Sequence, residues 1–111
     1  MVMDDYFDED GYPTAEALHK ITKWDYADIE GCFAFMRHLW AYDNYWREEK
    51  VSEDNYTGMQ YDTPRQRYFI STAGWSGNED IIRAFQENHL LWALTWVQSR
   101  RGGHYIFELR K

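Results

Sequence analysis

The chain has 111 residues and a formal net charge of −7; 44% of its residues are hydrophobic and 19% are aromatic. This length and composition predict one folded domain with a single core and exclude an intrinsically disordered chain. The acidic balance argues against direct nucleic-acid binding, and a single cysteine, Cys32, excludes an internal disulfide.

The charge is divided unevenly along the chain. Residues 1–62 hold 15 acidic and 5 basic residues (−10), whereas residues 63–111 hold 4 acidic and 7 basic residues (+3), which together give −7. The acidic half should attract a basic partner surface and permits imitation of a nucleic-acid backbone, although a merely solvated surface explains it as well. No run of about 18 apolar residues could span a membrane, and the lone cysteine fits a reducing cytoplasm.

The N-terminal part is expected to be a tail followed by a short helix. Residues 1–11 are acidic, unlike a signal peptide, and should form a flexible tail whose Tyr6 and Phe7 can dock on the domain or on a partner. Residues 12–111 then form a single α+β domain. The Pro13-Thr14 pair opens a short helix, in which three apolar residues recur at helical spacing: Leu18, Ile21 and Trp24.

A second, longer helix is expected over residues 27–49, with Asp25 as its N-cap. Apolar residues at steps of four, three and four mark its buried face: Ile29, Phe33, Met36 and Trp40. Cys32 beside this face should be buried and unreactive. Tyr42 and Tyr45 fall near the edges of the stripe, and Trp46 widens it.

A polar stretch at residues 51–64, with one glycine and one proline, predicts a loop. Its Tyr56 and Tyr61 are unusual for a simple connection, and long loops in compact domains are often functional. The first strand is expected over residues 65–72, with Tyr68, Phe69 and Ile70 at its centre.

A third helix is expected to begin at a capping box formed by Ser76 and Glu79. Asn88 should end this helix, whose buried side is lined by Ile81, Ile82 and Phe85. Residues 74–77 partly match the Gly-x-Ser-x-Gly pattern of hydrolases but are one residue short of it, and Ser76 is better explained as the cap.

Residues 89–99 predict a second strand that is apolar on both faces and therefore central. Its main face toward the helices consists of Leu90, Trp92, Leu94 and Trp96. Residues 100–103 form a glycine turn, and residues 104–110 return with Tyr105, Phe107 and Leu109 inward and His104, Ile106 and Glu108 outward. The predicted fold class is α+β: two N-terminal helices, then β-α-β-β with a C-terminal antiparallel hairpin.

No pattern typical of an enzyme is present. The histidines, His19, His38, His89 and His104, lack metal-ligand spacing, and Cys32 has no neighbouring base. We therefore expect a protein that is not an enzyme and that uses no metal or cofactor.

Two adjacent arginines, Arg100 and Arg101, lie at the hairpin tip of an otherwise acidic protein. They either pair with the protein's own carboxylates, which are abundant, or await an anionic ligand or partner surface. If the tip approaches the third helix, Trp75 could stack on a base or sugar while both arginines and His104 hold phosphate.

The run GWSGNE at residues 74–79, followed by WVxSRRGGHY at residues 96–105, resembles a pattern in small proteins of tailed bacteriophages, especially phages of actinobacteria. The resemblance covers about the last 45 residues and brings no established activity with it. It implies a phage protein acting in the cytoplasm of a bacterial host. By analogy, such small acidic proteins modulate host machinery or inhibit host defence.

Two functions remain open. The first is a non-enzymatic phage accessory protein that binds a host, defence or phage protein through its acidic, aromatic-rich surface. Tyr42, Tyr45, Trp46, the loop tyrosines and Trp75 are its candidate anchors. The alternative is a small-molecule binder, with a nucleotide signal as the candidate ligand, that uses Trp75, Arg100, Arg101 and His104.

Overall fold

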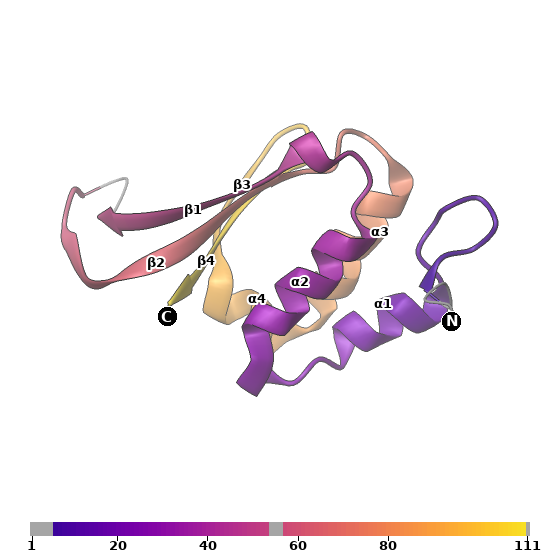
Figure 1. Cartoon of the computed structure of the whole chain (residues 1–111), viewed down its shortest axis with the longest axis horizontal. Coiled ribbons are helices and arrows are strands. Elements are labelled where there is room, and N and C mark those ends of the chain that lie inside the picture. Colours follow the sequence, from indigo (N-terminus) through magenta and orange to yellow (C-terminus); the bar gives the residue numbers. More distant parts are fainter. Residues whose placement is uncertain (1–5, 54–56, 111) are drawn as a thin grey trace.

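The order of helices and strands follows from a computed structural model, which describes residues 6–53 and 57–110 (Figure 1). Along the chain the helices and strands are α1 (Ala15–Thr22), α2 (Ile29–Leu39), β1 (Trp46–Glu53), β2 (Gln60–Ser71), α3 (Ser76–Glu87), α4 (His89–Thr95), β3 (Trp96–Arg100) and β4 (His104–Arg110). Two short 3-10 turns, η2 (Tyr26–Asp28) and η3 (Asp43–Tyr45), precede α2 and β1. The α+β class is therefore confirmed, and so is the C-terminal antiparallel hairpin. The predicted order β-α-β-β is wrong, because the order after α2 is β-β-α-α-β-β.

The four strands form one sheet in the order β1-β2-β4-β3, and every neighbouring pair is antiparallel. The chain leaves β2, passes through α3 and α4 to the far edge at β3, and then returns as β4 between them. The helices gather on one side of the sheet (Figure 1).

The core lies between the helices and the covered face of the sheet. At its centre, the Phe33 ring of α2 stacks on Tyr68 of β2, with ring centres 4.1 Å apart. Phe85 of α3 packs edge-on against Phe107 of β4 at 5.3 Å. Aromatic rings give a small core a large buried area, and such edge and stacked pairs add stability beyond that area.

The predicted helix over 27–49 is wrong in its second half, because α2 ends at Leu39. Tyr42 adopts a positive φ of 69°, which no α-helix accommodates, and the chain then reverses through η3. Trp46, expected on the helix, is instead the first residue of β1 and lies in the core at 4% exposure. The first half of the predicted helix is confirmed, and Phe33, Met36 and Trp40 are buried. The predicted N-cap is wrong, because Asp28 caps α2 and Asp25 caps η2.

The predicted loop over 51–64 is also wrong, since β1 continues to Glu53 and β2 already begins at Gln60. This part of the hairpin is polar, so it lacks the apolar alternation that identifies a half-buried strand. Tyr56 lies outside the described residues. The predicted strand over 65–72 is confirmed as the inner part of β2.

The predicted capping box is absent at the start of α3. Trp75 is the N-cap and supplies no side-chain hydrogen bond, and Glu79 N–H donates to the Trp75 carbonyl at 3.1 Å. Ser76 is already helical, and its hydroxyl donates to the Tyr12 hydroxyl at 3.4 Å. The buried side of Ile81, Ile82 and Phe85 and the end at Asn88 are confirmed.

Residues 89–95 form the helix α4 and not the predicted strand. Apolar residues in this run recur at the spacing of a strand and also at the spacing of a helix. Periodicity alone therefore cannot distinguish the two. Asn88 decides it locally, because its side chain accepts from Leu91 N–H and caps the helix. As a result Leu90 and Leu94 are half exposed, whereas Trp92 packs on Phe85 and Phe107.

The expected acidic tail at residues 1–11 lies partly outside the described residues. Its described part folds back through an isolated bridge between Phe7 and Pro13. The Tyr6 ring meets Phe35 of α2 at 5.0 Å, and the Phe7 ring meets His38 at 5.7 Å. Both aromatic residues thus dock on the domain.

Candidate functional site

Strand alternation divides the sheet into a covered face and an open face. Tyr68 and Ile70 of β2 point into the core, so Phe69 between them points to the open side. In the register of the sheet, Phe69 stands between Arg47 of β1 and Ile106 of β4. These three side chains form one row across the open face.

A second row lies two residues away along β2 and β4. Ser71 of β2 pairs with His104 of β4, which in turn pairs with Arg100 of β3. Ser71 Oγ and His104 Nδ1 are hydrogen-bonded at 2.6 Å. This bond fixes the imidazole beside the arginine.

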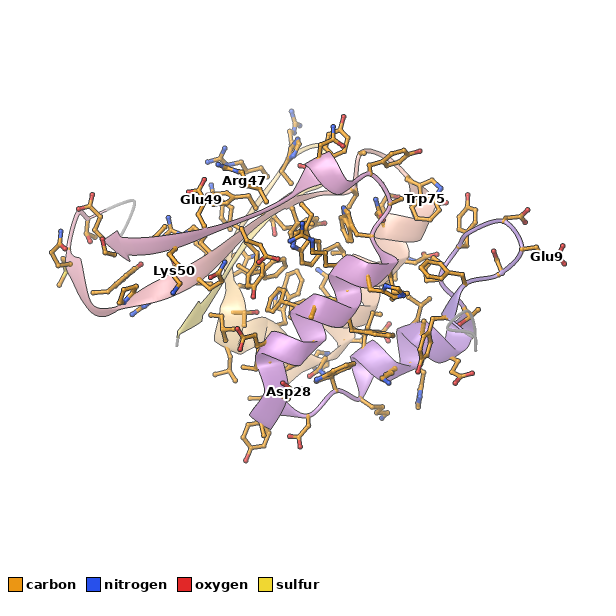
Figure 2. The ribbon with its side chains drawn as sticks, in the orientation of Figure 1. Glu9, Asp28, Arg47, Glu49, Lys50 and Trp75 are labelled. Atoms are coloured by element: carbon orange, nitrogen blue, oxygen red, sulfur yellow. The ribbon has the colours of Figure 1, made fainter. Side chains whose placement is uncertain are left out.

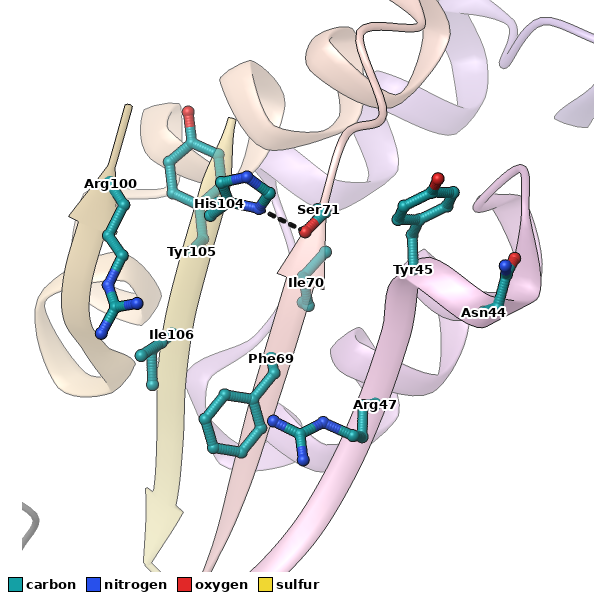
Figure 3. A pocket seen from close by; sticks show the side chains of 10 residues that line it. All are labelled: Asn44, Tyr45, Arg47, Phe69, Ile70, Ser71, Arg100, His104, Tyr105 and Ile106. Carbon is teal, nitrogen blue, oxygen red and sulfur yellow. Dashed lines mark hydrogen bonds between the residues drawn. The ribbon is translucent and has the colours of Figure 1, made fainter. Parts of the chain in front are cut away.

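The two rows enclose a hollow of about 370 Å³ (Figure 3). Its described lining residues are Asn44, Tyr45, Arg47, Phe69, Ile70, Ser71, Arg100, His104, Tyr105 and Ile106. Arg47 and Arg100 reach inward from the two outer strands over a floor made by Phe69 and Ile106 (Figure 3). None of the described lining residues is a carboxylate, although the protein has 19 of them.

The two arginines of the hollow differ in their partners. Arg47 pairs with Glu49, and its guanidinium carbon lies 4.1 Å from the centre of the Phe69 ring. Such a cation–π contact favours a planar guanidinium over a lysine. Arg100 makes no ion pair with any residue in the described ranges 6–53 and 57–110, and neither does Arg101.

The hairpin tip does approach the start of α3. Gly102 and Gly103 adopt positive φ angles of 87° and 79°, and Thr72 N–H donates to the Gly103 carbonyl at 3.0 Å. Any side chain at Gly103 would collide with the Thr72 hydroxyl. The tip is therefore held against the turn that leads into α3.

Trp75 does not join the tip arginines in one site. Its ring lies 4.7 Å from the Tyr12 ring and covers Gly77, where a Cβ atom would collide with the indole. Figure 2 shows Trp75 beside α3, and it does not line the hollow. Of the four predicted anion-site residues, only Arg100 and His104 line the hollow together; Arg101 is exposed in the turn.

The predicted aromatic anchors separate in the same way. Tyr42 and Tyr45 are exposed at 55% and 43%, and their rings meet at 6.3 Å. Tyr45 also lines the hollow, whereas Tyr42 lies outside it. Trp46 is buried and packs against Trp40 at 5.5 Å.

The sequence analysis missed Arg47, Phe69 and Ser71 as site residues. The alternation in residues 67–71, with Tyr68 and Ile70 apolar, could have placed Phe69 and Ser71 on the opposite face. Arg47 has no such signal, because residues 46–53 are mostly charged and lack the apolar alternation of a half-buried strand.

A second charged cluster occupies the other end of the open face. Glu108 accepts from Arg67 Nε at 2.8 Å, from Arg65 at 3.1 Å and from the Tyr61 hydroxyl at 3.3 Å. Arg67 is only 2% exposed, so the pair has to be intact for the fold. Two guanidiniums on one carboxylate leave the cluster with a positive balance.

The single cysteine, Cys32, does not line the hollow. Burial raises the pKa of the Cys32 thiol from 9.0 to about 12, and the nearby Asp28 carboxylate adds to the rise. A thiol with such a pKa is protonated at neutral pH and a poor nucleophile. Within the described part of the chain, no three histidine, cysteine or carboxylate side chains are grouped to hold a metal ion.

No protein-family model matches this chain, and neither a curated protein nor a solved structure matches it. Among the described residues, no helix has the length and apolar character needed to cross a bilayer.

Proposed function

We propose that this protein is a non-enzymatic binding protein that holds a small anionic ligand in the hollow on the open face of its sheet. One observation carries the proposal. Arg47, Arg100 and His104 line the hollow without any described carboxylate, in a chain with a net charge of −7. Guanidiniums attract anions and bind phosphate or carboxylate through two parallel hydrogen bonds.

The hollow is formed before any ligand binds, which favours binding. Strands β2 and β4 provide its floor, and the Ser71–His104 hydrogen bond fixes one wall. A rigid site loses little entropy when the ligand binds. We further propose, from the phage-like motif, that the protein works in the cytoplasm of a bacterial host.

A second candidate function is the binding and modulation of a host or defence protein. The exposed pair Tyr42 and Tyr45 favours it, because tyrosines are common anchors in protein interfaces. Exposed carboxylates, such as Asp25 and Asp28 next to the exposed Tyr26, favour a basic partner surface.

Titration with inorganic phosphate and pyrophosphate, followed by amide chemical shifts, tests the first proposal. Shifts should concentrate on Ser71, Arg100 and His104, weaken with added salt, and vanish in Arg100→Ala. Tyr42→Ala, which lies outside the hollow, serves as the control and should leave them unchanged. Shifts spread evenly over the surface, or unaffected by Arg100→Ala, would contradict the proposal.

A further inference from the structure

Resting on the proposed anion-binding function, we propose that the ligand is a mononucleotide. Its phosphate lies between Arg100 and His104, and its base lies over Phe69 and Ile106 beside Arg47. The hollow has a polar row and an apolar row, and a mononucleotide is the ligand that uses both.

The spacing of the two rows comes from strand geometry. Ser71 and Phe69 are two residues apart on β2, and His104 and Ile106 are two residues apart on β4. Because a strand rises about 3.4 Å per residue, the rows lie roughly 7 Å apart. The phosphate and the base of one nucleotide are separated by a comparable span, since a single ribose joins them.

The phosphate belongs at the polar row because only that row has an uncommitted guanidinium. Arg100 makes no ion pair within the described residues, whereas Arg47 is held by Glu49 and by the Phe69 ring. His104 is paired with Arg100 in the strand register, and its hydrogen bond to Ser71 orients the ring. When the Ser71 hydroxyl donates to Nδ1, the other ring nitrogen carries the proton and can donate to the phosphate. An arginine and a histidine together match the several oxygens of a phosphate.

The base belongs at the apolar row. Phe69 and Ile106 form its floor, and the Arg47 guanidinium already stacks on Phe69 at 4.1 Å. A base can extend this stack, because guanidinium planes and aromatic rings both pack on bases. Tyr45 and Asn44 close the adjacent side and offer a hydroxyl and an amide (Figure 3).

The size and the surroundings of the hollow exclude the neighbouring ligand classes. A volume of about 370 Å³ lies within the range of small-molecule pockets. A bare phosphate would leave the Phe69 and Ile106 floor without a role. A nucleic-acid strand needs a groove of uncommitted cations that continues past one nucleotide. Further along the same face the arginines are already committed, since Arg65 and Arg67 pair with Glu108.

Calorimetric titration of the full chain tests this. The probes are the 5′-monophosphates of adenosine, guanosine, cytidine and uridine, the four nucleosides, inorganic phosphate and a single-stranded eight-nucleotide DNA. We expect at least one mononucleotide to bind about tenfold or more tightly than both phosphate and its own nucleoside.

The matched variants are Arg100→Ala and Arg101→Ala, which remove the same charge from the same turn. Only Arg100 lines the hollow, so Arg100→Ala should weaken the mononucleotide about tenfold or more and Arg101→Ala by less than about twofold. Phe69→Leu should weaken the mononucleotide but not phosphate. Amide spectra of each variant establish that it is folded.

Each other outcome overturns the inference. If phosphate binds as tightly as every mononucleotide and this binding depends on Arg100, the proposed anion site stands but the mononucleotide inference is wrong. Tighter binding of the oligonucleotide than of any mononucleotide would replace the inference with a strand-binding face. No Arg100-dependent binding of any probe would overturn both the inference and the proposed function.

Discussion

At the scale of single residues, Asn78 joins three segments of the chain. It is fully buried, and its side-chain oxygen accepts from Ala41 N–H at 3.0 Å. Its amide group donates to the Ala41 carbonyl at 3.1 Å and to the Thr72 carbonyl at 3.3 Å. One side chain therefore holds the chain reversal before β1 against the end of β2 and the start of α3.

Replacing Asn78 by alanine should destabilise the protein by about 1–3 kcal/mol, because it leaves buried backbone groups without partners. The measurement is the urea midpoint of unfolding. Asn44→Ala, an exposed asparagine in the neighbouring turn, is the control and should change stability by less than about 0.5 kcal/mol. Equal effects of the two substitutions would show that Asn78 does not hold these segments together.

Cys32 links burial to a pH dependence of stability. Its thiol pKa is raised from 9.0 to about 12 in the folded protein, mainly by burial. The native state therefore favours the protonated thiol, and the resulting stability is fully present below about pH 9 and lost as the pH rises toward 12. Burial also raises the pKa of the Tyr68 hydroxyl, which acts in the same direction.

We expect the urea midpoint of unfolding to decrease as the pH is raised from 9 to 11. Cys32 should lower the folding equilibrium constant by up to about tenfold per pH unit. In Cys32→Ala this fall should be shallower, even though the variant starts from lower stability. Parallel curves for the two proteins would mean that the thiol does not carry the effect.

At the scale of elements, the start of α3 depends on a missing side chain. The Trp75 indole occupies the space above Gly77, where a Cβ atom would collide with it, and Tyr12 packs near the same ring. Glycine is normally a poor helix former, about 1 kcal/mol worse than alanine. Here close packing outweighs propensity.

Gly77→Ala should therefore lower the melting temperature, although alanine on an open helix would raise it. In a Trp75→Ala background the same substitution should become neutral or stabilising, because the obstructing ring is gone. A double-mutant cycle of melting temperatures measures this coupling. Additive effects would rule out the contact as the cause.

The elements predictable from sequence were those in which local signals agreed. The helix α1 begins after Pro13-Thr14 as expected, and Thr14 proves to be its N-cap. Phe33 and Met36 of α2 have the helical spacing of a buried face. The hairpin at residues 100–103 carries its own glycines. In contrast, α4 is apolar at both periods and β1 is mostly charged, so only tertiary packing decides them.

The candidate site was predictable only in the part that belongs to one hairpin. Arg100 and His104 lie on neighbouring strands joined by a short turn, so sequence alone brings them together. Phe69 and Arg47 join them only through the pairing of β2 with β4 and of β1 with β2. Trp75 was misplaced because its ring turns toward Tyr12, which lies far away in the sequence.

At the scale of the whole molecule, acidic side chains gather near the start of α2, whereas no described carboxylate lines the hollow on the open face. The segment that carries η2 and the start of α2 bears Asp25, Asp28 and Glu30, whereas Arg47, Arg67 and Arg100 belong to the open face. If the proposed anion binding is correct, the acidic start of α2 should repel the ligand and the hollow should attract it. Such a field orients approach as well as adding affinity.

Because β4 lies between β2 and β3, the sheet can be completed only late in synthesis of the chain. Until residues 104–110 have emerged, β2 has only β1 beside it, and an isolated two-stranded hairpin is marginal in water. The nascent chain also carries β3 without any neighbouring strand. Since the hollow draws residues from all four strands, it is complete only when this segment has been synthesised and inserted.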